Sequence, residues 1–245
     1  MSHDSNHNDH HHDAHELNWI QKYVFSVDHK IIGIQYTVTA LLFLLFGFCL
    51  MMIMRWQLAY PGEEIPVVGK WLGDNLAPGG VLSPDTYNSF GAMHGTIMIF
   101  LGVVPLAVGG FGNYLVPLQI GAADMAFPKL NAASYWSYFV GGVIMFYGFF
   151  APGGAANSGW TSYPPLAVLA TTGQTIWLIG MIALITSSLL GSINTIVTII
   201  QLRAKGMTFF RMPFLVWAQF VTGFLLVLAF PPLEAAGILQ LMDRL

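Results

Sequence analysis

Charged side chains are scarce in this sequence. Asp, Glu, Lys and Arg make up 9% of its 245 residues, whereas 55% are hydrophobic. A soluble domain carries roughly a quarter charged residues, so the composition excludes an ordinary soluble protein and favours a membrane protein. The single cysteine, Cys49, excludes an intrachain disulfide. No basic patch is present either, and a net charge of −3 gives no reason to expect nucleic acid as a partner.

The N-terminus lacks the positively charged segment that begins a signal peptide. It is a polar stretch rich in His and Asp, which cannot bury enough apolar surface to fold. We therefore expect residues 1–25 to be a disordered tail. Weak binding of a transition metal is the alternative role for its histidines. These are His3, His7, His10, His11, His12 and His15.

Long apolar runs dominate the rest of the chain. A helix of about 20 residues crosses the ~30 Å apolar core of a bilayer, and five runs reach that length. The predicted fold is an all-α, polytopic transmembrane helix bundle over residues 26–245. Proline and glycine predict breaks at Pro105 in the second run and at Pro231 and Pro232 in the fifth. The five expected spans are residues 31–54, 88–117, 131–150, 172–202 and 213–240.

Lys and Arg are distributed unevenly between the two sides of such a bundle. Arg55, Lys70 and Arg244 fall on the side opposite the N-terminus. Cytoplasmic loops are enriched in Lys and Arg, so the more basic side, with the N-terminal tail, is expected in the cytoplasm. The basic residues of that side are Lys22, Lys30, Lys129, Arg203, Lys205 and Arg211.

The second span has one candidate functional residue within it and another just beyond its end. His94 lies inside its apolar run, and Asp124 follows its other end, on the expected cytoplasmic side. A histidine within a span is costly and usually functional, and a neutral imidazole is a good ligand for haem iron. From the residue alone, metal or haem ligation, hydrogen-bonded packing and proton relay all remain open for His94.

Further polar residues occur within the second to fifth spans. Those of the second to fourth spans predict either interhelical hydrogen bonds or a water-filled path that starts at Asp124. Glu234, in the fifth span, is either a neutral or paired structural acid near the outer interface or a group that handles protons or neighbours a cofactor. The candidates for the path are Asn113, Asn131, Ser134, Ser188 and Asn194.

Several segments closely resemble one protein family, subunit I of haem-copper oxidases of the cytochrome c oxidase type. The segment SVDHKIIGIQY precedes and enters the first span, and HGTIMIF begins at His94. The segments GGFGNYLVPLQIGAADMAFPKLN and GWTSYPPLA begin at Gly109 and Gly159. The resemblance covers residues 26–245, and the segments are too long and specific for a chance match.

The resemblance implies roles for individual residues. His94 stands where the family has one axial ligand of the low-spin haem. Arg55 stands where the family has an arginine that hydrogen-bonds the formyl group of haem A, and Trp160 lies in a loop that closes over the region near the catalytic centre. Asp124 matches the acid at the mouth of the D proton channel. The family's polar residues around and above that mouth correspond to Asn113, Asn131, Ser134, Ser188 and Asn194.

In this family electrons pass from cytochrome c, through copper and the low-spin haem, to a haem–copper pair that reduces oxygen to water. Protons for the chemistry and for pumping enter from the cytoplasm. The resemblance therefore implies a terminal respiratory oxidase in a bacterial plasma membrane, assembled with subunits II and III. The family subunit has many more spans than five, so we expect this chain to be an N-terminal portion. The ligands of copper and of the high-spin haem, and the second axial histidine of the low-spin haem, are not in it.

Four other functions are alternatives to a terminal oxidase of the cytochrome c type. A quinol oxidase or a nitric oxide reductase shares the scaffold, although Asp124 with its asparagines argues against the reductase. A transport or structural subunit without a redox centre forms a second class. A dihaem cytochrome b-like carrier needs paired histidines on two spans, and His94 is the only histidine within the expected spans.

Overall fold

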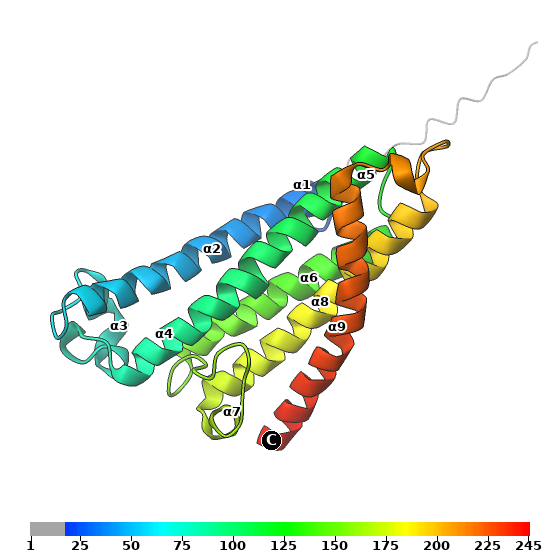
Figure 1. The fold of residues 1–245 in the computed structure, drawn as a ribbon. Helices are drawn as coiled ribbons and strands as arrows, with labels where there is room; N and C mark the ends of the chain where they lie inside the picture. The colour runs from blue at the N-terminus through cyan, green and yellow to red at the C-terminus, as the bar shows by residue number, and fades with distance from the viewer. Residues whose placement is uncertain (1–17) are drawn as a thin grey trace, which may run out of the picture.

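The computed structural model describes residues 18–245, so the six histidines of the tail lie outside the described residues. The described chain is built from long helices that lie side by side in an elongated bundle (Figure 1). This architecture confirms the predicted all-α class. The bundle helices are α2 (His29–Ala59), α4 (Pro84–Thr96), η2 (Ile97–Val103), η3 (Pro105–Gly112), α5 (Asn113–Ile120), α6 (Pro128–Tyr147), α8 (Thr172–Gln201) and α9 (Phe214–Arg244).

Four helices are long and apolar enough to cross a membrane. They are α2, the continuous helix from α4 to α5 over Pro84–Ile120, α8 and α9. The remaining expected span is α6, whose 20 residues suffice in length. It is less apolar than the others because Asn131, Ser134 and several tyrosines lie on it. Since α6 packs along α8, it belongs to the same bundle (Figure 1).

Proline does not break the helices where the sequence predicted breaks. Helix α9 continues through Pro231 and Pro232, and the second helix continues through Pro105. Helical backbone persists through proline in spans because neighbouring residues and small local adjustments satisfy the freed backbone groups. Around Pro105 the adjustment is a wider turn, since η2 and η3 are π-helical on both sides of Val104.

A short helix, α1 (Trp19–Tyr23), forms within the segment that was predicted to be a disordered tail. The side chain of Gln35 donates hydrogen bonds to the carbonyls of Tyr23 at 2.7 Å and Val24 at 2.8 Å, which fastens the end of α1 to α2. The prediction of disorder is therefore wrong for this helix. The remaining short helices lie in the connections: α3 (Val68–Leu76), η1 (Pro78–Gly80), η4 (Gly148–Phe150), α7 (Leu166–Leu169) and η5 (Phe209–Arg211).

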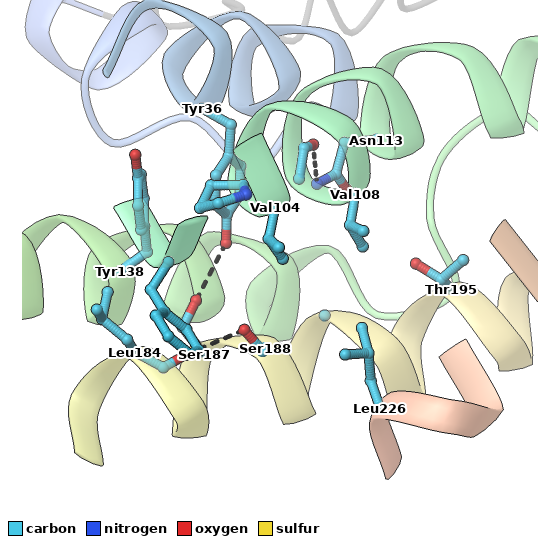
Figure 2. Close-up of a pocket in the computed structure, with 14 residues that line it drawn as sticks. Tyr36, Val104, Val108, Asn113, Tyr138, Leu184, Ser187, Ser188, Thr195 and Leu226 are labelled. Atoms are coloured by element: carbon cyan, nitrogen blue, oxygen red, sulfur yellow. Dashed lines mark hydrogen bonds between the residues drawn. The ribbon is translucent and has the colours of Figure 1, made fainter. Parts of the chain in front are cut away.

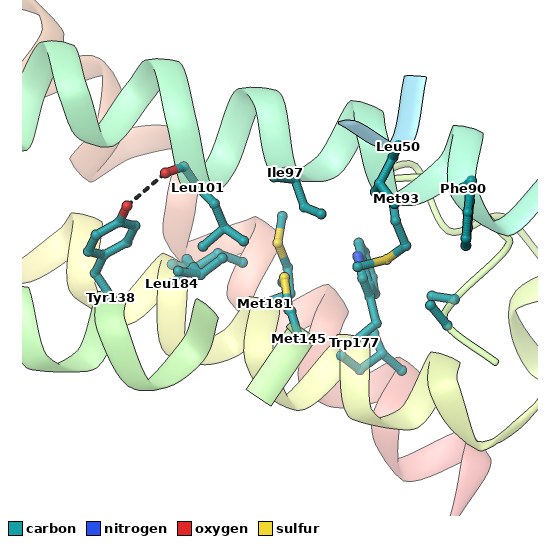
Figure 3. Packing of buried hydrophobic residues seen from close by; sticks show 14 of the residues in the cluster. Leu50, Phe90, Met93, Ile97, Leu101, Tyr138, Met145, Trp177, Met181 and Leu184 are labelled. Atoms are coloured by element: carbon teal, nitrogen blue, oxygen red, sulfur yellow. Dashed lines mark hydrogen bonds between the residues drawn. The ribbon is translucent and has the colours of Figure 1, made fainter. Parts of the chain in front are cut away.

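The core lies where α2, the second helix, α6 and α8 meet, and α8 is packed between α6 and α9. Helices α6 and α8 approach closely at two glycines: a Cβ on Gly141 would lie 2.9 Å from the carbonyl oxygen of Gly180, and the reverse distance is the same. Small residues allow such close contact between helices in membranes. Figure 3 shows core side chains from four helices: Leu50, Met93, Ile97, Leu101, Met145, Trp177, Met181 and Leu184.

The bundle has two ends, which we name by their candidate functional residues. The Asp124 end carries α1, the end of α5 and η5, and the His94 end carries α3, α7 and the end of α9 (Figure 1). At the His94 end the 151–171 segment folds back onto the bundle. Ser89 donates a hydrogen bond of 2.8 Å to the carbonyl of Ala155 in this segment. Arg244 donates to the carbonyls of Ala170 and Thr171, both at 2.9 Å, which ties its far end to α9.

Candidate functional site

His94 lies about 15 Å from the start of the second helix, given a rise of 1.5 Å per residue. Its Nδ1 atom is 2.8 Å from the backbone carbonyl oxygen of Gly47 on α2. A carbonyl oxygen can only accept, so Nδ1 carries the proton and donates it. The Nε2 atom then keeps its lone pair, which is the state that a metal-ligating histidine requires.

The surroundings of His94 fit a flat cofactor on one side. The imidazole is partly exposed, and no atom lies within 4 Å of the position where a Cβ on Gly95 would stand. On the other side the hydrogen bond to Gly47 fixes the ring, and α2 packs closely there, because a Cβ on Gly47 would lie 2.8 Å from Sδ of Met98. The tautomer of His94, its fixed ring and the open space at Gly95 match one half of a haem site. Among residues 18–245 there is no cluster of three metal-ligating side chains of the kind that would hold a separate metal ion.

Arg55 and Trp160 take different positions relative to His94. Arg55 is exposed on α2, eight residues beyond Gly47 and so about 12 Å nearer the His94 end. It makes no hydrogen bond within the part of the chain that the structure describes. Trp160 lies against Phe100 of the second helix, with ring centroids 6.0 Å apart. The loop of Trp160 therefore reaches into the bundle, whereas Arg55 remains at its surface.

Asp124 lies at the opposite end, half-buried in the loop between α5 and α6. This loop is fastened to α8 by Asn194, whose Oδ1 accepts from the amide of Phe127 at 2.9 Å and whose Nδ2 donates to the carbonyl of Phe127 at 3.2 Å. Thr198 accepts from the amide of Ala126 at 2.9 Å. Asn194 thus holds the loop of Asp124 in place, and both polar atoms of its side chain are occupied in doing so.

Asn131 and Asn113 differ from Asn194 in this respect. Asn131 is fully buried in the first turn of α6, and neither its Oδ1 nor its Nδ2 has a partner within residues 18–245. Asn113 donates from Nδ2 to the carbonyl of Gly109 at 2.7 Å, but its buried Oδ1 is also unpaired. Leaving such atoms dry costs about 1–3 kcal/mol each, which makes them sites where water is strongly favoured.

Hydroxyl groups continue from Asn131 toward the middle of the bundle. Ser134 donates to the carbonyl of Asn131 at 2.7 Å and accepts from the hydroxyl of Tyr36 at 3.1 Å. The hydroxyls of Tyr36 and Ser187 are 3.3 Å apart, and Ser187 donates to the carbonyl of Ser134 at 2.6 Å. These contacts join α2, α6 and α8 through one chain of polar groups.

A cavity of about 40 Å³ lies beside these groups, between the second helix, α8 and α9. A single water needs roughly 10–15 Å³ by this measure, so the cavity has room for two or three. Its polar lining comes from α2, the second helix, α6 and α8, with Asn113 toward one end and the pair Tyr36 and Ser187 near the other (Figure 2). The polar residues that line it are Tyr36, Asn113, Tyr138, Ser187, Ser188 and Thr195.

The sequence predicted part of this arrangement and missed part of it. Asn113 and Ser188 line the cavity, and Ser134 joins its hydroxyl network, as a polar path would require. Tyr36 and Ser187 were not predicted, although the structure puts them at the centre of the network. The signal in the sequence is a hydroxyl in the middle of an apolar span, but it is a weak one because tyrosine is equally common in a hydrophobic core.

Glu234 is partly buried where α9 packs on α8. Its Oε1 atom is 2.5 Å from the hydroxyl oxygen of Thr186, which is close to the midpoint of α8. It lies about 15 Å from the end of α9 at Arg244, and its position near the outer interface stays a prediction.

Comparison with known proteins identifies the family. The family model described as "Cytochrome C and Quinol oxidase polypeptide I" matches residues 31–245. The chain belongs to this family. Cytochrome c oxidase subunit 1 of Thermostichus vulcanus is 46% identical over 226 residues, which cover 92% of this chain and 38% of the relative. The corresponding subunit of Synechocystis sp. is 41% identical over the same shares, and an alternative subunit 1 of Bradyrhizobium diazoefficiens is 39% identical over 94% of this chain and 37% of its own length.

Membership of the oxidase polypeptide I family confirms the resemblance predicted from the sequence. It also identifies the chain as part of a multi-pass membrane protein, in agreement with the apolar helices. The chain spans less than two fifths of the length of the curated relatives it matches. The matched relatives are bacterial proteins, which is consistent with the predicted bacterial membrane.

Proposed function

We propose that this chain supplies the N-terminal part of subunit I of a proton-pumping terminal oxidase. The full protein would transfer electrons from cytochrome c to oxygen in a bacterial plasma membrane. Within it, His94 would hold a low-spin haem through its imidazole, and Asp124 would be the residue at which protons from the cytoplasm enter. The observation that carries this proposal is the hydrogen bond from Nδ1 of His94 to the carbonyl of Gly47, because it leaves Nε2 free for iron.

At the His94 end, the chain holds and orients the imidazole that would bind the haem iron. The Gly47 carbonyl fixes the ring plane and the tautomer, and it raises the basicity of the coordinating nitrogen. When bound, the haem supplies one-electron transfer. Arg55 would pair with a polar substituent of the macrocycle, which for the expected haem A is the formyl group, and the exposed guanidinium is free to do so. The loop that carries Trp160 would close over this region.

The contribution at the Asp124 end is to collect and pass protons. A carboxylate at the mouth, the unpaired amide of Asn131, the unpaired Oδ1 of Asn113, and the cavity beside Tyr36 and Ser187 form a series of polar sites from Asp124 into the bundle. Water at these sites conducts protons along hydrogen bonds. Asn194 acts as a positioning residue, since it fixes the loop that carries Asp124.

The proposed partners follow from the same family. Subunits II and III would complete the complex, and cytochrome c is the proposed electron donor because the relatives carry the name cytochrome c oxidase. A quinol donor is the second candidate, since the family description covers both cytochrome c and quinol oxidases. The copper ion and the high-spin haem would be held by parts of the protein outside this chain.

The proposal is tested by the haem spectrum of the full-length enzyme with the substitution His94→Ala. The reduced-minus-oxidised spectrum should lose the low-spin haem signal, because the other histidine of the spanning helices, His29, lies at the opposite end of the bundle and cannot replace the ligand. His94→Met, which keeps a possible iron ligand, should retain haem with a shifted band. Full low-spin signal in an assembled His94→Ala enzyme would contradict the assignment.

A matched control is available in His29, which is buried and whose Nδ1 also contacts a backbone carbonyl, that of Asn113 at 2.8 Å. It lies at the Asp124 end, far along the bundle from His94. His29→Gln should leave the low-spin haem signal unchanged. Comparison of the His94→Ala and His29→Gln enzymes separates loss of a haem ligand from the general damage caused by removal of a buried histidine.

A further inference from the structure

The loop between α8 and α9 carries positive charge and exposed aromatic rings that the roles above leave unused. It covers residues 202–213, at the Asp124 end of the bundle (Figure 1). Both flanking helices are long and apolar enough to cross a membrane, so the loop lies where the apolar core of the bilayer meets water. From Leu202 to Phe214 the sequence holds three basic residues and no acidic one. The basic residues are Arg203, Lys205 and Arg211.

Part of this loop is fastened to the bundle. Arg203 donates to the carbonyl of Met207 at 3.3 Å, and its guanidinium lies 3.9 Å from the ring centroid of Phe209. The carbonyl of Phe209 accepts from Nε1 of Trp217 at 2.9 Å, and Met212 is buried. Arg203 is therefore engaged in holding the loop, and these contacts fix the backbone that carries the two other cations.

The two other cations lie at one turn of the loop. Lys205 and Arg211 are exposed, and within residues 18–245 neither forms an ion pair. Nη1 of Arg211 donates to the carbonyl of Gly206 at 3.4 Å, so its guanidinium lies beside the residue that follows Lys205. Gly206 has a φ of 86°, a conformation that glycine adopts without strain and that turns the chain at this point. The long side chain of Lys205 can therefore reach an anion that Arg211 holds.

Two exposed phenylalanines accompany these cations. Phe210 is 96% exposed and Phe214 is 89% exposed, although Phe209 beside them packs against Trp217. Basic residues together with exposed phenylalanine are typical of segments that lie at the membrane surface, with the rings at the boundary of headgroups and acyl chains. We call this surface the Arg211 patch and define it as Lys205, Phe210, Arg211 and Phe214.

We propose that the Arg211 patch binds the headgroup of an anionic phospholipid. A guanidinium matches a phosphate group with two parallel N–H donors, and Lys205 adds a second positive charge. In this arrangement Phe210 and Phe214 lie against the acyl chains. The expected orientation puts the patch in the cytoplasmic leaflet, where anionic lipids attract basic residues.

A lipid fits the Arg211 patch better than a protein partner does. A protein would have to supply both an acidic group for the two cations and an apolar surface for the two rings. An anionic phospholipid supplies both at the depth where the ends of α8 and α9 already place the loop. The inference goes beyond the proposed function, because it concerns the surrounding membrane and not the redox chemistry.

The test is native mass spectrometry of the purified full-length protein in detergent while phosphatidylglycerol is added. The wild-type protein should hold one more phosphatidylglycerol molecule than the double variant Lys205→Gln/Arg211→Gln, in which the affinity of this site should fall by about tenfold or more. Phe210→Ser should weaken the same site by about threefold. Arg211→Lys, which keeps the charge but loses the fork of donors, should weaken it by less than the double variant does. Phosphatidylcholine should bind equally to all of these proteins.

The matched control is Lys30→Gln, which removes an exposed lysine at the same end of the bundle and should bind phosphatidylglycerol as the wild type does. An equal loss in Lys30→Gln and in the double variant would overturn the inference, because it would reflect overall surface charge. Wild-type binding in the double variant would also overturn it and leave the loop as a contact with protein.

Two further outcomes keep the test decisive. Displacement of phosphatidylglycerol by an equal concentration of inorganic phosphate would overturn the inference, because the site would then recognise phosphate without the lipid. If the double variant does not assemble, Lys205→Gln and Arg211→Gln are measured singly, and wild-type binding in both contradicts the inference equally. The measurement does not depend on haem, so its failure is distinct from that of the His94→Ala test.

Discussion

The two halves of this bundle treat their buried polar groups in opposite ways. In the His94 half most of them are paired: His94 bonds to Gly47, and Gln174, fully buried, donates to Ser162 at 3.0 Å and accepts from Ser158 at 2.7 Å. In the Asp124 half many are not. Among the described residues, the buried side chains there with an unpaired polar atom are Gln35, Asn113, Gln119, Asn131, Ser192 and Gln219, against Trp56 and Asn157 in the other half.

This difference is what two different tasks require. A haem ligand must be held in one orientation, and every hydrogen bond made by its surroundings contributes to that. A proton path must instead offer hydrogen-bonding sites to mobile water, and a polar atom already paired with protein cannot do so. Unpaired buried atoms destabilise the fold, so their concentration near Asp124 is more consistent with conduction than with packing.

The largest effect on the Asp124 half is expected from Asp124→Asn. Removal of the carboxylate takes away the group that collects protons, so turnover of the full enzyme should fall by at least about tenfold. Oxygen consumption and proton uptake by the purified enzyme measure this. The control is Asp85→Asn, the same change at the His94 end, in the first turn of the helix whose other end leads into the loop of Asp124. It should have little effect. Equal effects of the two substitutions would remove the distinction between the halves.

A second test compares an unpaired asparagine with a paired one. Asn131→Leu replaces a buried amide without partners by an apolar side chain of similar size, so thermal stability should be unchanged or higher. Proton uptake should nevertheless slow several-fold, because a water site is lost. Asn194→Leu removes both bonds to Phe127 and should lower stability by about 1–3 kcal/mol.

Thermal unfolding and uptake kinetics of the two variants decide this comparison. If Asn131→Leu destabilises the protein as much as Asn194→Leu, then Asn131 has a structural partner outside residues 18–245. The conducting role would then lose its main support, and Asn131 would have to be treated as part of the packing.

The sequence was sufficient for the bundle because lack of charge and length of apolar runs determine spans almost by themselves. It also singled out His94 and Asp124 as candidates, which stand out because ionisable residues are rare around them. It failed at Pro105, Pro231 and Pro232, where the rule for helices in water predicted breaks. In a membrane bundle the helical backbone continues there, since leaving it unbonded costs more than a local distortion.

The details of the site depended on contacts between distant segments, which spacing cannot reveal. Tyr36 is 98 residues from Ser134, and only the packing of α2 on α6 brings their hydroxyls together. Asn194 looked like a member of a water path, but its position opposite Phe127 makes it a fastening for the Asp124 loop. The partner of Glu234, Thr186, lies 48 residues earlier in the chain, on the other side of the loop between α8 and α9.

The smallest effect is expected in the paired half, from Gly47→Ala. A Cβ there would lie 2.8 Å from Sδ of Met98 and 3.3 Å from Cγ2 of Ile97, so the backbone or these side chains must shift by a few tenths of an ångström. The carbonyl of Gly47 would move relative to His94 and weaken their hydrogen bond. Haem should remain bound, with a shifted reduction potential and a small shift of its absorption band. Gly237→Ala, where the nearest atom is 3.6 Å away, should shift neither.

The direction of the potential shift makes this test specific. A weaker hydrogen bond from Nδ1 lowers the electron donation of the imidazole to iron, which favours the reduced state and raises the potential. A fall in potential would mean that the carbonyl of Gly47 does not tune the ligand. Loss of haem would mean that the paired half tolerates no displacement at all, and that the contrast between a fixed ligand and an adaptable water path is sharper than the hydrogen bonds alone indicate.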